Sequence, residues 1–197
     1  MSVRNPIVAI TGSSGAGTST VLHAFRHIFR REKLRAQIIH GDSFHRFDRE
    51  EMNKAMKASE KRGNKNFSHL GPSANLLEDL ETLFRTYGET GEGKFRRYLH
   101  DSDEAAFFKQ DAGTFTPWEE IKKQTDLLFY EGLHGGRTAL PRAFGECIFG
   151  RRRGFGVAIV LVLRGHRPIS TASSIYSVAL QTVSRRWRGA RPNLKAA

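Results

Sequence analysis

The stretch with the clearest chemical signal lies near the N-terminus, where a short apolar run ends in glycines and hydroxyl residues. The apolar run is Ile7–Ile10, and the glycine-rich segment covers residues 11–20. Gly12, Gly17 and Ser19 occupy the required places of the phosphate-binding template G-x-x-x-x-G-K-[ST]. Glycines let backbone N–H groups converge on phosphate oxygens, and a serine hydroxyl at the last position can hold Mg²⁺. The spacing therefore predicts a phosphate-binding loop.

One position departs from the template, because the lysine slot holds Thr18. The lysine would bring positive charge to the β- and γ-phosphates, so another group must supply that charge here. The alternative is an ordinary strand-to-helix turn that binds nothing. The helix expected after the loop favours phosphate binding, because its apolar residues fall on one face. These residues are Val21, Leu22, Phe25, Ile28 and Phe29.

Two acidic residues follow predicted strands. Asp42 comes directly after the expected strand 36–40, where the carboxyl ends of strands form a crevice in α/β sheets. Its carboxylate suits a general base or a metal ligand, although the same residues also suit a simple turn. The apolar run 126–130 ends in Glu131, a layout in which the carboxylate reaches Mg²⁺ directly or through water. An apolar strand that ends in a glutamate is common by itself. Glu131 is a candidate metal ligand because it occurs together with the glycine-rich loop and Asp42.

Two helices are expected between these acids. The first has Asp48 as N-cap with Glu51 three residues later, ends at Gly63, and exposes most of its charges. The second is capped by Ser73, ends at Gly88 and belongs to the core. Its apolar face comprises Leu76, Leu77, Leu80, Leu83, Phe84 and Tyr87.

Two further segments are expected to be mostly irregular. Residues 65–72 form a polar connection that contains His69. Residues 89–118 are rich in glycine and charge, and only 95–101 resembles a strand. We interpret this second segment as an active-site lid or substrate loop and not as a separate domain.

Composition predicts a soluble α/β protein, since 197 residues suffice for one domain with a core. No stretch approaches the ~20 apolar residues that span a bilayer, and the N-terminus lacks a signal-peptide layout. We therefore expect a cytoplasmic location and no membrane partner. Cys147 is the single cysteine, which excludes an internal disulfide and a cysteine-cluster metal site. The eight histidines show no paired zinc-ligand spacing on a helix.

The net charge of +12 belongs to the end of the chain. Residues 137–197 contain twelve arginines and lysines against one acid, Glu146. An ATP-binding module whose basic tail docks on nucleic acid or anionic lipid is one explanation. Trp187 lies among three arginines, but the tail offers little else on which bases could stack. No nucleic-acid partner is therefore expected.

Several motifs in order resemble phosphoribulokinase, in its bacterial branch. They are Gly12–Ser19, Gly41–Arg46, Tyr87–Gly91, Tyr98–Asp101 and Phe129–Gly135. The resemblance covers about residues 4–135. A threonine in the lysine slot looks typical of that branch. The resemblance implies an α/β phosphate-loop kinase-like fold, a mostly parallel sheet flanked by helices, here incomplete at the C-terminus. Residues 1–136 would be the N-terminal ATP-binding part of the kinase.

The resemblance also implies an activity. Phosphoribulokinase transfers the γ-phosphoryl of ATP, with Mg²⁺, to the 1-hydroxyl of ribulose 5-phosphate, giving the acceptor for CO₂ in the Calvin cycle. Such transfer depends on in-line positioning and charge neutralisation, which suits the residues found. A uridine or pantothenate kinase uses a similar loop and acid and is the alternative within enzymes. The turn 42–46 and residues 98–100 favour the sugar phosphate.

Individual residues take roles from the same resemblance. Asp42 would accept the hydroxyl proton, and Ser19 and Glu131 would position Mg²⁺. The residues implied to bind ATP are Gly12, Ser13, Ser14, Gly15, Ala16, Gly17, Thr18, Ser19 and Thr20. The residues implied to contact the sugar phosphate are His45, Arg49 and His100.

The resemblance also implies features of regulation and assembly. Plant-type members carry a redox cysteine pair with one cysteine inside the phosphate loop, but Ala16 occupies that region here. Thiol switching is therefore not expected. Bacterial members respond to NADH and AMP, and Arg31 matches a position implicated in that allosteric response. A homo-oligomer is implied for the intact family member.

Beyond Gly136 the resemblance stops. The family continues with further strands and basic substrate contacts, whereas residues 137–197 are rich in Arg, Ala, Gly and Ser. We interpret this tail as a high-GC coding region read out of frame. That interpretation predicts a poorly ordered tail, weak or absent activity, an open strand edge and uncovered apolar faces. Poor solubility or association of the chain would follow.

Overall fold

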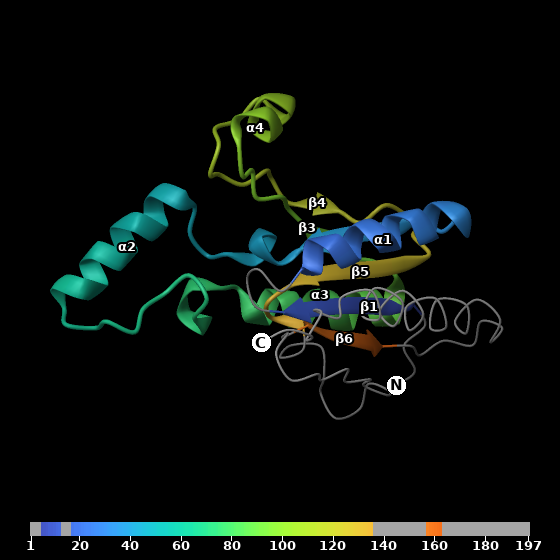
Figure 1. Cartoon of the computed structure of the whole chain (residues 1–197), viewed down its shortest axis with the longest axis horizontal. Helices are drawn as coiled ribbons and strands as arrows, with labels where there is room; N and C mark the ends of the chain where they lie inside the picture. The colour runs from blue at the N-terminus through green and yellow to red at the C-terminus, as the bar shows by residue number, and fades with distance from the viewer. Residues whose placement is uncertain (1–4, 13–16, 136–156, 163–197) are drawn as a thin grey trace, which may run out of the picture.

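The computed structural model describes residues 5–12, 17–135 and 157–162 of the chain. Helices, short 3₁₀ turns (η) and strands alternate along it, with α2 and α4 projecting from the body that surrounds the larger sheet (Figure 1). In chain order the elements are β1 (Ile7–Gly12), α1 (Thr18–Arg31), β2 (Ala36–His40), η1 (Gly41–Phe44), α2 (Arg49–Lys61), η2 (Pro72–Ala74), α3 (Leu77–Thr90), β3 (Lys94–Phe95), α4 (Ser102–Phe108), β4 (Glu119–Glu120), β5 (Leu127–Gly132) and β6 (Val157–Val162).

The larger sheet has four strands in the order β2-β5-β1-β6. β5 lies parallel to both β1 and β2, while β6 runs antiparallel to β1. The register places Glu131 between Ile10 on one side and His40 on the other. Because β1, β2 and β5 run in the same direction, the three predicted motifs that follow them meet at one edge of the sheet.

The core is divided between the two faces of the sheet. Successive residues of a strand point to opposite faces, so Ile7 and Ala9 of β1 belong to one cluster and Val8 and Ile10 to the other. The cluster that includes α3 contains Ile7, Ala9, Ile39, Phe44, Leu80, Leu83, Phe84, Tyr87, Phe95, Ile121, Leu128 and Tyr130. The cluster that includes α1 contains Val8, Ile10, Leu22, Phe25, Ile28, Phe29, Leu127 and Phe129. The predicted apolar face of the first helix is therefore confirmed.

α2 begins as predicted and buries little. The Asp48 side chain accepts from the backbone N–H of Glu51, and the Glu51 side chain accepts from that of Asp48, which completes a capping box. The helix ends at Lys61, two residues before the predicted stop at Gly63, with a C-cap at Arg62. Its charged, exposed surface matches the expectation of a solvated helix.

The predicted limits of the next helix are wrong at both ends. Ser73 belongs to η2, a separate 3₁₀ turn, and α3 begins only at Leu77. Gly88 lies inside α3 and is buried, and its carbonyl accepts from the Asn5 N–H at 3.1 Å. Gly91 ends the helix, because its positive φ of 78° gives the left-handed turn that a C-cap glycine adopts.

Residues 89–118 contain more structure than the predicted extended piece 95–101. Only Lys94–Phe95 forms a strand, paired with β4, and the helix α4 follows from Ser102. Asp101 starts this helix because its carboxylate accepts from the backbone N–H groups of residues 103 and 104. The two arms of the segment are joined by hydrogen bonds between Leu99 and both Gly113 and Thr114.

Among the described strands β2, the strand after the loop, lies at one edge of the sheet, whereas β1 is paired on both sides. β6 lies in the predicted basic tail and pairs with β1 from Ile7 to Gly12. Its sequence, Val-Ala-Ile-Val-Leu-Val, has the β-branched content that favours strands. The rest of the tail, including Cys147 and Trp187, lies outside the described residues. Within the described ranges, no helix is long and apolar enough to cross a membrane.

Candidate active site

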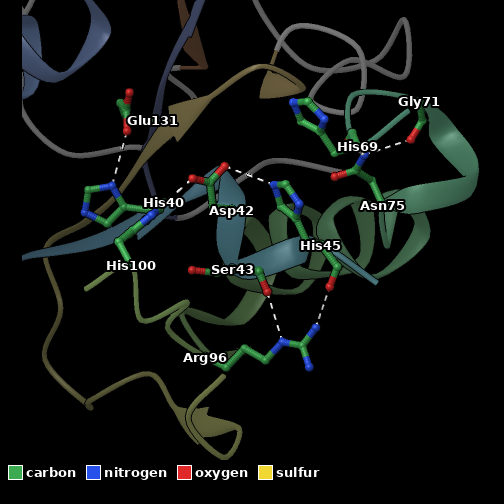
Figure 2. Close-up of polar contacts among 10 residues, drawn as sticks. All are labelled: His40, Asp42, Ser43, His45, His69, Gly71, Asn75, Arg96, His100 and Glu131. Atoms are coloured by element: carbon green, nitrogen blue, oxygen red, sulfur yellow. Dashed lines mark hydrogen bonds and ion pairs between the residues drawn. The ribbon is translucent and has the colours of Figure 1, made fainter. Parts of the chain in front are cut away.

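The site forms where β2 and β5 end, and it contains two acidic side chains in different surroundings (Figure 2). Asp42 belongs to the turn η1 directly after β2, and Glu131 is the fifth residue of β5. The strands approach closely at this edge, since a Cβ on Gly132 would lie 2.7 Å from Gly41 Cα. Glycines at both strand ends therefore let the two acid-bearing segments come together.

The Asp42 carboxylate faces histidines. His45 Nε2 lies 3.0 Å from one carboxylate oxygen, and His100 Nε2 lies 3.5 Å from the other. The hydrogen bond from His45 holds the pKa of Asp42 below its usual value, with further help from the charges of His45, His100 and His40. Asp42 is also half exposed, at 52% of its side-chain surface. An ionised carboxylate that solvent or a ligand can reach is suited to accepting a proton.

The ring of Tyr98 contacts both of the histidines that flank Asp42. Tyr98 stacks on His45 with ring centroids 6.1 Å apart and meets His100 edge-on at 4.9 Å. Phe115 packs against Tyr98 from the return arm of the 89–118 segment. The imidazoles that flank Asp42 therefore depend on a segment more than fifty residues away in the sequence.

The Glu131 carboxylate is mostly buried, with 13% of its side chain exposed. It accepts a hydrogen bond from His40 Nδ1 at 3.2 Å and another from the Thr18 hydroxyl. The bond from His40, followed by the bond from Thr18, lowers the pKa of Glu131 against the opposing effect of burial. Thr18, the residue in the lysine slot, thus contacts the second acid of the site.

The N-terminus of α1 lies beside Glu131. Gly17 is the N-cap, with a left-handed φ of 85°, and it has no side chain with which to cap the first N–H groups of the helix. Such a helix N-terminus favours anions. Ser19 is exposed in the first turn, and Thr20 follows it. Ser13, Ser14, Gly15 and Ala16 lie outside the described residues.

A hard divalent cation is compatible with the donors present. The Glu131 carboxylate and the Ser19 hydroxyl are oxygen donors of the kind that Mg²⁺ prefers, and Mg²⁺ commonly takes only one or two protein ligands beside phosphates and water. The described residues contain no group of three or more His, Cys, Asp or Glu side chains that could hold a metal ion. The ionised state of Glu131 favours the same fit.

Two predicted residues are engaged elsewhere. Arg49 Nη2 donates to the backbone carbonyl of His100 at 2.7 Å, so its guanidinium anchors the segment that carries His100. Arg31 lies near the end of α1 and pairs with Glu32 at 2.8 Å on an exposed surface. Arg31 therefore has no contact with Asp42 or Glu131 in the described part of the chain.

The sequence did not single out two residues that complete the site. His40 contacts Glu131, and Arg96 donates to backbone carbonyls of the Asp42 turn. Tyr98 belongs to the motif Tyr98–Asp101, but its support of two histidines was not predicted. The position of His40 at the end of a strand was a usable signal, because parallel pairing places it opposite the acid of the next strand. The contacts of Arg96 carried no comparable signal, since they depend on how the 89–118 segment folds back.

The sheet, the glycine-capped helix after β1 and the two acids at neighbouring strand ends define a phosphate-loop kinase-like α/β protein. A family model described as the Phosphoribulokinase / Uridine kinase family matches residues 7–139. The chain belongs to this family. The predicted fold class and the resemblance to phosphoribulokinase are thereby confirmed.

Curated relatives and a solved structure agree with this placement. The chain is 60% identical over 136 residues to the chromosomal phosphoribulokinase of Cupriavidus necator, covering 69% of this chain and 47% of the relative. It is 51% identical over 135 residues to phosphoribulokinase 1 of Cereibacter sphaeroides, covering 68% and 47%. The phosphoribulokinase structure from Rhodobacter spheroides matches with a TM-score of 0.58 at 44% identity, covering 68% of this chain and 44% of that chain. The chain thus spans about half the length of these relatives.

Proposed function

We propose that this chain is the N-terminal, catalytic-base-bearing part of a phosphoribulokinase, which transfers the γ-phosphoryl of ATP to the 1-hydroxyl of ribulose 5-phosphate. The observation that carries the proposal is the Asp42 carboxylate, whose pKa is lowered and which is half exposed and flanked by two imidazoles, at the same sheet edge as Glu131. The names of the curated relatives supply the substrate. A role in Calvin-cycle carbon fixation in the cytoplasm follows from the same proposal.

In the proposed reaction, Asp42 takes the proton of the attacking hydroxyl, which makes the oxygen a better nucleophile. His45 and His100 flank the Asp42 carboxylate, and together with Arg49 they are the residues proposed to contact the sugar phosphate. Arg49 also donates to the His100 carbonyl. The loop from Gly12 to Thr20 and the N-terminus of α1 bind the ATP phosphates. The 89–118 segment, which contacts the Asp42 turn through His100 and Arg96, is the proposed lid or substrate loop.

Ser19 and Glu131 are the residues proposed to hold Mg²⁺. The ion supplies charge neutralisation on the transferring phosphoryl group when it is bound. His40 and Thr18 fix the Glu131 carboxylate in the orientation that such a ligand needs. With a threonine in the lysine slot, the helix N-terminus and the bound cation carry the positive charge that a lysine would otherwise bring.

Assembly, regulation and the tail remain parts of this proposal. The intact protein is proposed to be a homo-oligomer with NADH and AMP as effectors acting through Arg31, and without a nucleic-acid or membrane partner. Residues 1–136 are proposed as the kinase part and 137–197 as a frameshifted tail. Reading the coding DNA from the codon of Asp126 onward in all frames tests the tail directly.

A substrate panel tests the proposed activity. The purified chain is mixed with ATP and Mg²⁺ and with ribulose 5-phosphate, uridine or pantothenate, and the phosphorylated product is identified by mass spectrometry. Formation of ribulose 1,5-bisphosphate alone supports the proposal. Phosphorylation of uridine or pantothenate without ribulose 5-phosphate would support the other branch of the family. A chain that binds ATP calorimetrically but turns over no acceptor would contradict activity of this half-length chain.

A further inference from the structure

The turn that carries Asp42 has backbone carbonyls that need partners, because 3₁₀ turns leave their last carbonyls unpaired. Two of them are bonded by backbone N–H groups. The Asp42 carbonyl accepts from His45 N at 3.1 Å, and the Phe44 carbonyl accepts from Leu76 N at 2.7 Å. The carbonyls of Ser43 and His45 face Arg96 of the 89–118 segment instead (Figure 2).

One guanidinium group bonds both remaining carbonyls. Arg96 Nε donates to the Ser43 carbonyl at 3.0 Å, and Arg96 Nη2 donates to the His45 carbonyl at 2.6 Å (Figure 2). A guanidinium is planar and its donors are fixed relative to one another, so the two carbonyls are held at a set separation. His45 is the residue whose ring contacts Asp42, and it is therefore held at its backbone and at its ring.

Aromatic rings hold the guanidinium itself. Its central carbon lies 3.6 Å from the ring centroid of Phe115 and 4.9 Å from that of Trp118. Trp118 also meets Phe44 edge-on, with centroids 5.8 Å apart, and Phe44 is buried in the core. The Arg96 guanidinium is thus a half-buried cation between packed rings, where its two hydrogen bonds to the Asp42 turn are shielded from water. We call Arg96 with Phe115 and Trp118 the clamp.

The neighbouring arginine provides an internal comparison. Arg97 also lies over two aromatic rings, at 5.1 Å from Phe95 and 5.7 Å from Phe108. Within the described residues its guanidinium makes no hydrogen bond to the Asp42 turn. The two arginines are adjacent in the chain and share charge and aromatic contact, although with different rings. Of the two, only Arg96 bonds the turn, whereas Arg97 Nε is buried without a hydrogen-bond partner in the described part of the chain.

We propose that Arg96 is a positioning residue that fixes the separation between the Asp42 carboxylate and the His45 imidazole by clamping the carbonyls of Ser43 and His45. Its catalytic consequence rests on the proposed function, in which Asp42 takes the hydroxyl proton. Its structural consequence does not, because the geometry of the Asp42–His45 pair is measurable without turnover.

Arg96→Lys is the test variant and Arg97→Lys the matched control. A lysine keeps the charge, but its single ammonium cannot reproduce the two fixed bonds. The Asp42 carboxyl is observed by ¹³C NMR as a function of pH, with Asp42→Asn identifying its resonance. Arg96→Lys is expected to raise the pKa of Asp42 toward its ordinary value, because the bond from His45 loosens, while Arg97→Lys leaves that pKa as in the parent.

Kinetics supply the second measurement. A displacement of the base of about 1 Å lowers kcat by about 10²-fold, so Arg96→Lys is expected to lose kcat on that scale. KM for ATP is expected to stay within about twofold of the parent, since the nucleotide loop follows a different strand. If the parent chain shows no turnover, the proposed function fails, and the NMR titration alone still decides the role of Arg96.

Trp118→Leu is a second test variant in case Arg96→Lys does not fold. This substitution removes one aromatic ring from the Arg96 guanidinium and leaves the two hydrogen bonds of Arg96 in place. A smaller rise in the Asp42 pKa is expected from that variant. Thermal unfolding followed by circular dichroism separates loss of the fold from local change. An Asp42 pKa unchanged in every folded clamp variant, or an equal rise in Arg97→Lys, would overturn the proposal.

Discussion

The ends of β2 and β5 are neighbours in the sheet, yet they present their acids differently. Asp42 is half exposed, and its partners His45 and His100 come from a turn and from the distant 89–118 segment. Glu131 is mostly buried, and its partners His40 and Thr18 come from β2 and from the start of α1. One acid is thus held by loops and the other by the sheet and the helix that follows β1.

This difference supports the different roles proposed for the two acids. A buried carboxylate fixed by two hydrogen bonds keeps one orientation, as a ligand of a cation must. A half-exposed carboxylate bordered by imidazoles can meet a second substrate and take its proton. The same strand-end position therefore serves two proposed roles, and the surroundings of each acid decide which.

The sharpest test of the contrast is Asp42→Asn. Asparagine keeps the shape of the side chain but cannot take up a proton, so kcat is expected to fall about 10²–10⁴-fold with little change in KM for ATP. Steady-state kinetics with ribulose 5-phosphate measures both quantities. Near-normal turnover in this variant would remove Asp42 from the role of base.

His40→Ala tests the other strand end. Loss of the residue that orients a metal-binding carboxylate typically weakens metal affinity by about 10–100-fold, and we expect that loss for Mg²⁺ bound with ATP. Calorimetric titration at several Mg²⁺ concentrations measures it, with Asp42→Asn as the control that should bind as the parent does. If ATP binding by the parent and by His40→Ala depends equally on the Mg²⁺ concentration, Glu131 is not a ligand of the cation.

The close approach of the two strand ends is tested by Gly132→Ala. The added Cβ would lie 2.7 Å from both Gly41 Cα and Tyr130 Oη, so the free energy of unfolding is expected to drop by about 1–3 kcal/mol. Urea denaturation measures the drop. Adding Tyr130→Phe removes one of the two clashing atoms and should restore part of the stability, and a fully stable Gly132→Ala chain would argue against this packing.

The smallest expected effect is the pH dependence of stability. Both acids have folded pKa values below their ordinary values, so their stabilisation is present above about pH 4, the unfolded range, and is lost as pH falls through the folded pKa values. Urea unfolding from pH 6 down to pH 2.5 should therefore show a shallower decline in Glu131→Gln than in the parent. Asp42→Asn should show a weaker version, because solvent screens the exposed carboxylate.

Much of the sheet was predictable because its signals are local. The apolar runs of β1, β2 and β5 and the stripe of α1 follow from the periods of strands and helices, and parallel pairing then brings Gly12, Asp42 and Glu131 to one edge. The capping box of α2 was equally visible, because it needs only the four residues from 48 to 51. The limits of α3 were not, since Gly88 is accommodated in a buried helix and a later glycine ends it.

The sequence by itself determined three things: the glycine-rich motif after β1, the placement of Asp42 and Glu131 at the ends of strands, and the family. Each of these depends on residue types at fixed spacing. Only the tertiary structure decided that His40 meets Glu131, that Tyr98 carries two imidazoles and that Arg96 clamps the Asp42 turn. It also decided that β6 pairs with β1. These contacts join residues far apart in the chain, and no local pattern encodes which distant groups a folded segment will reach.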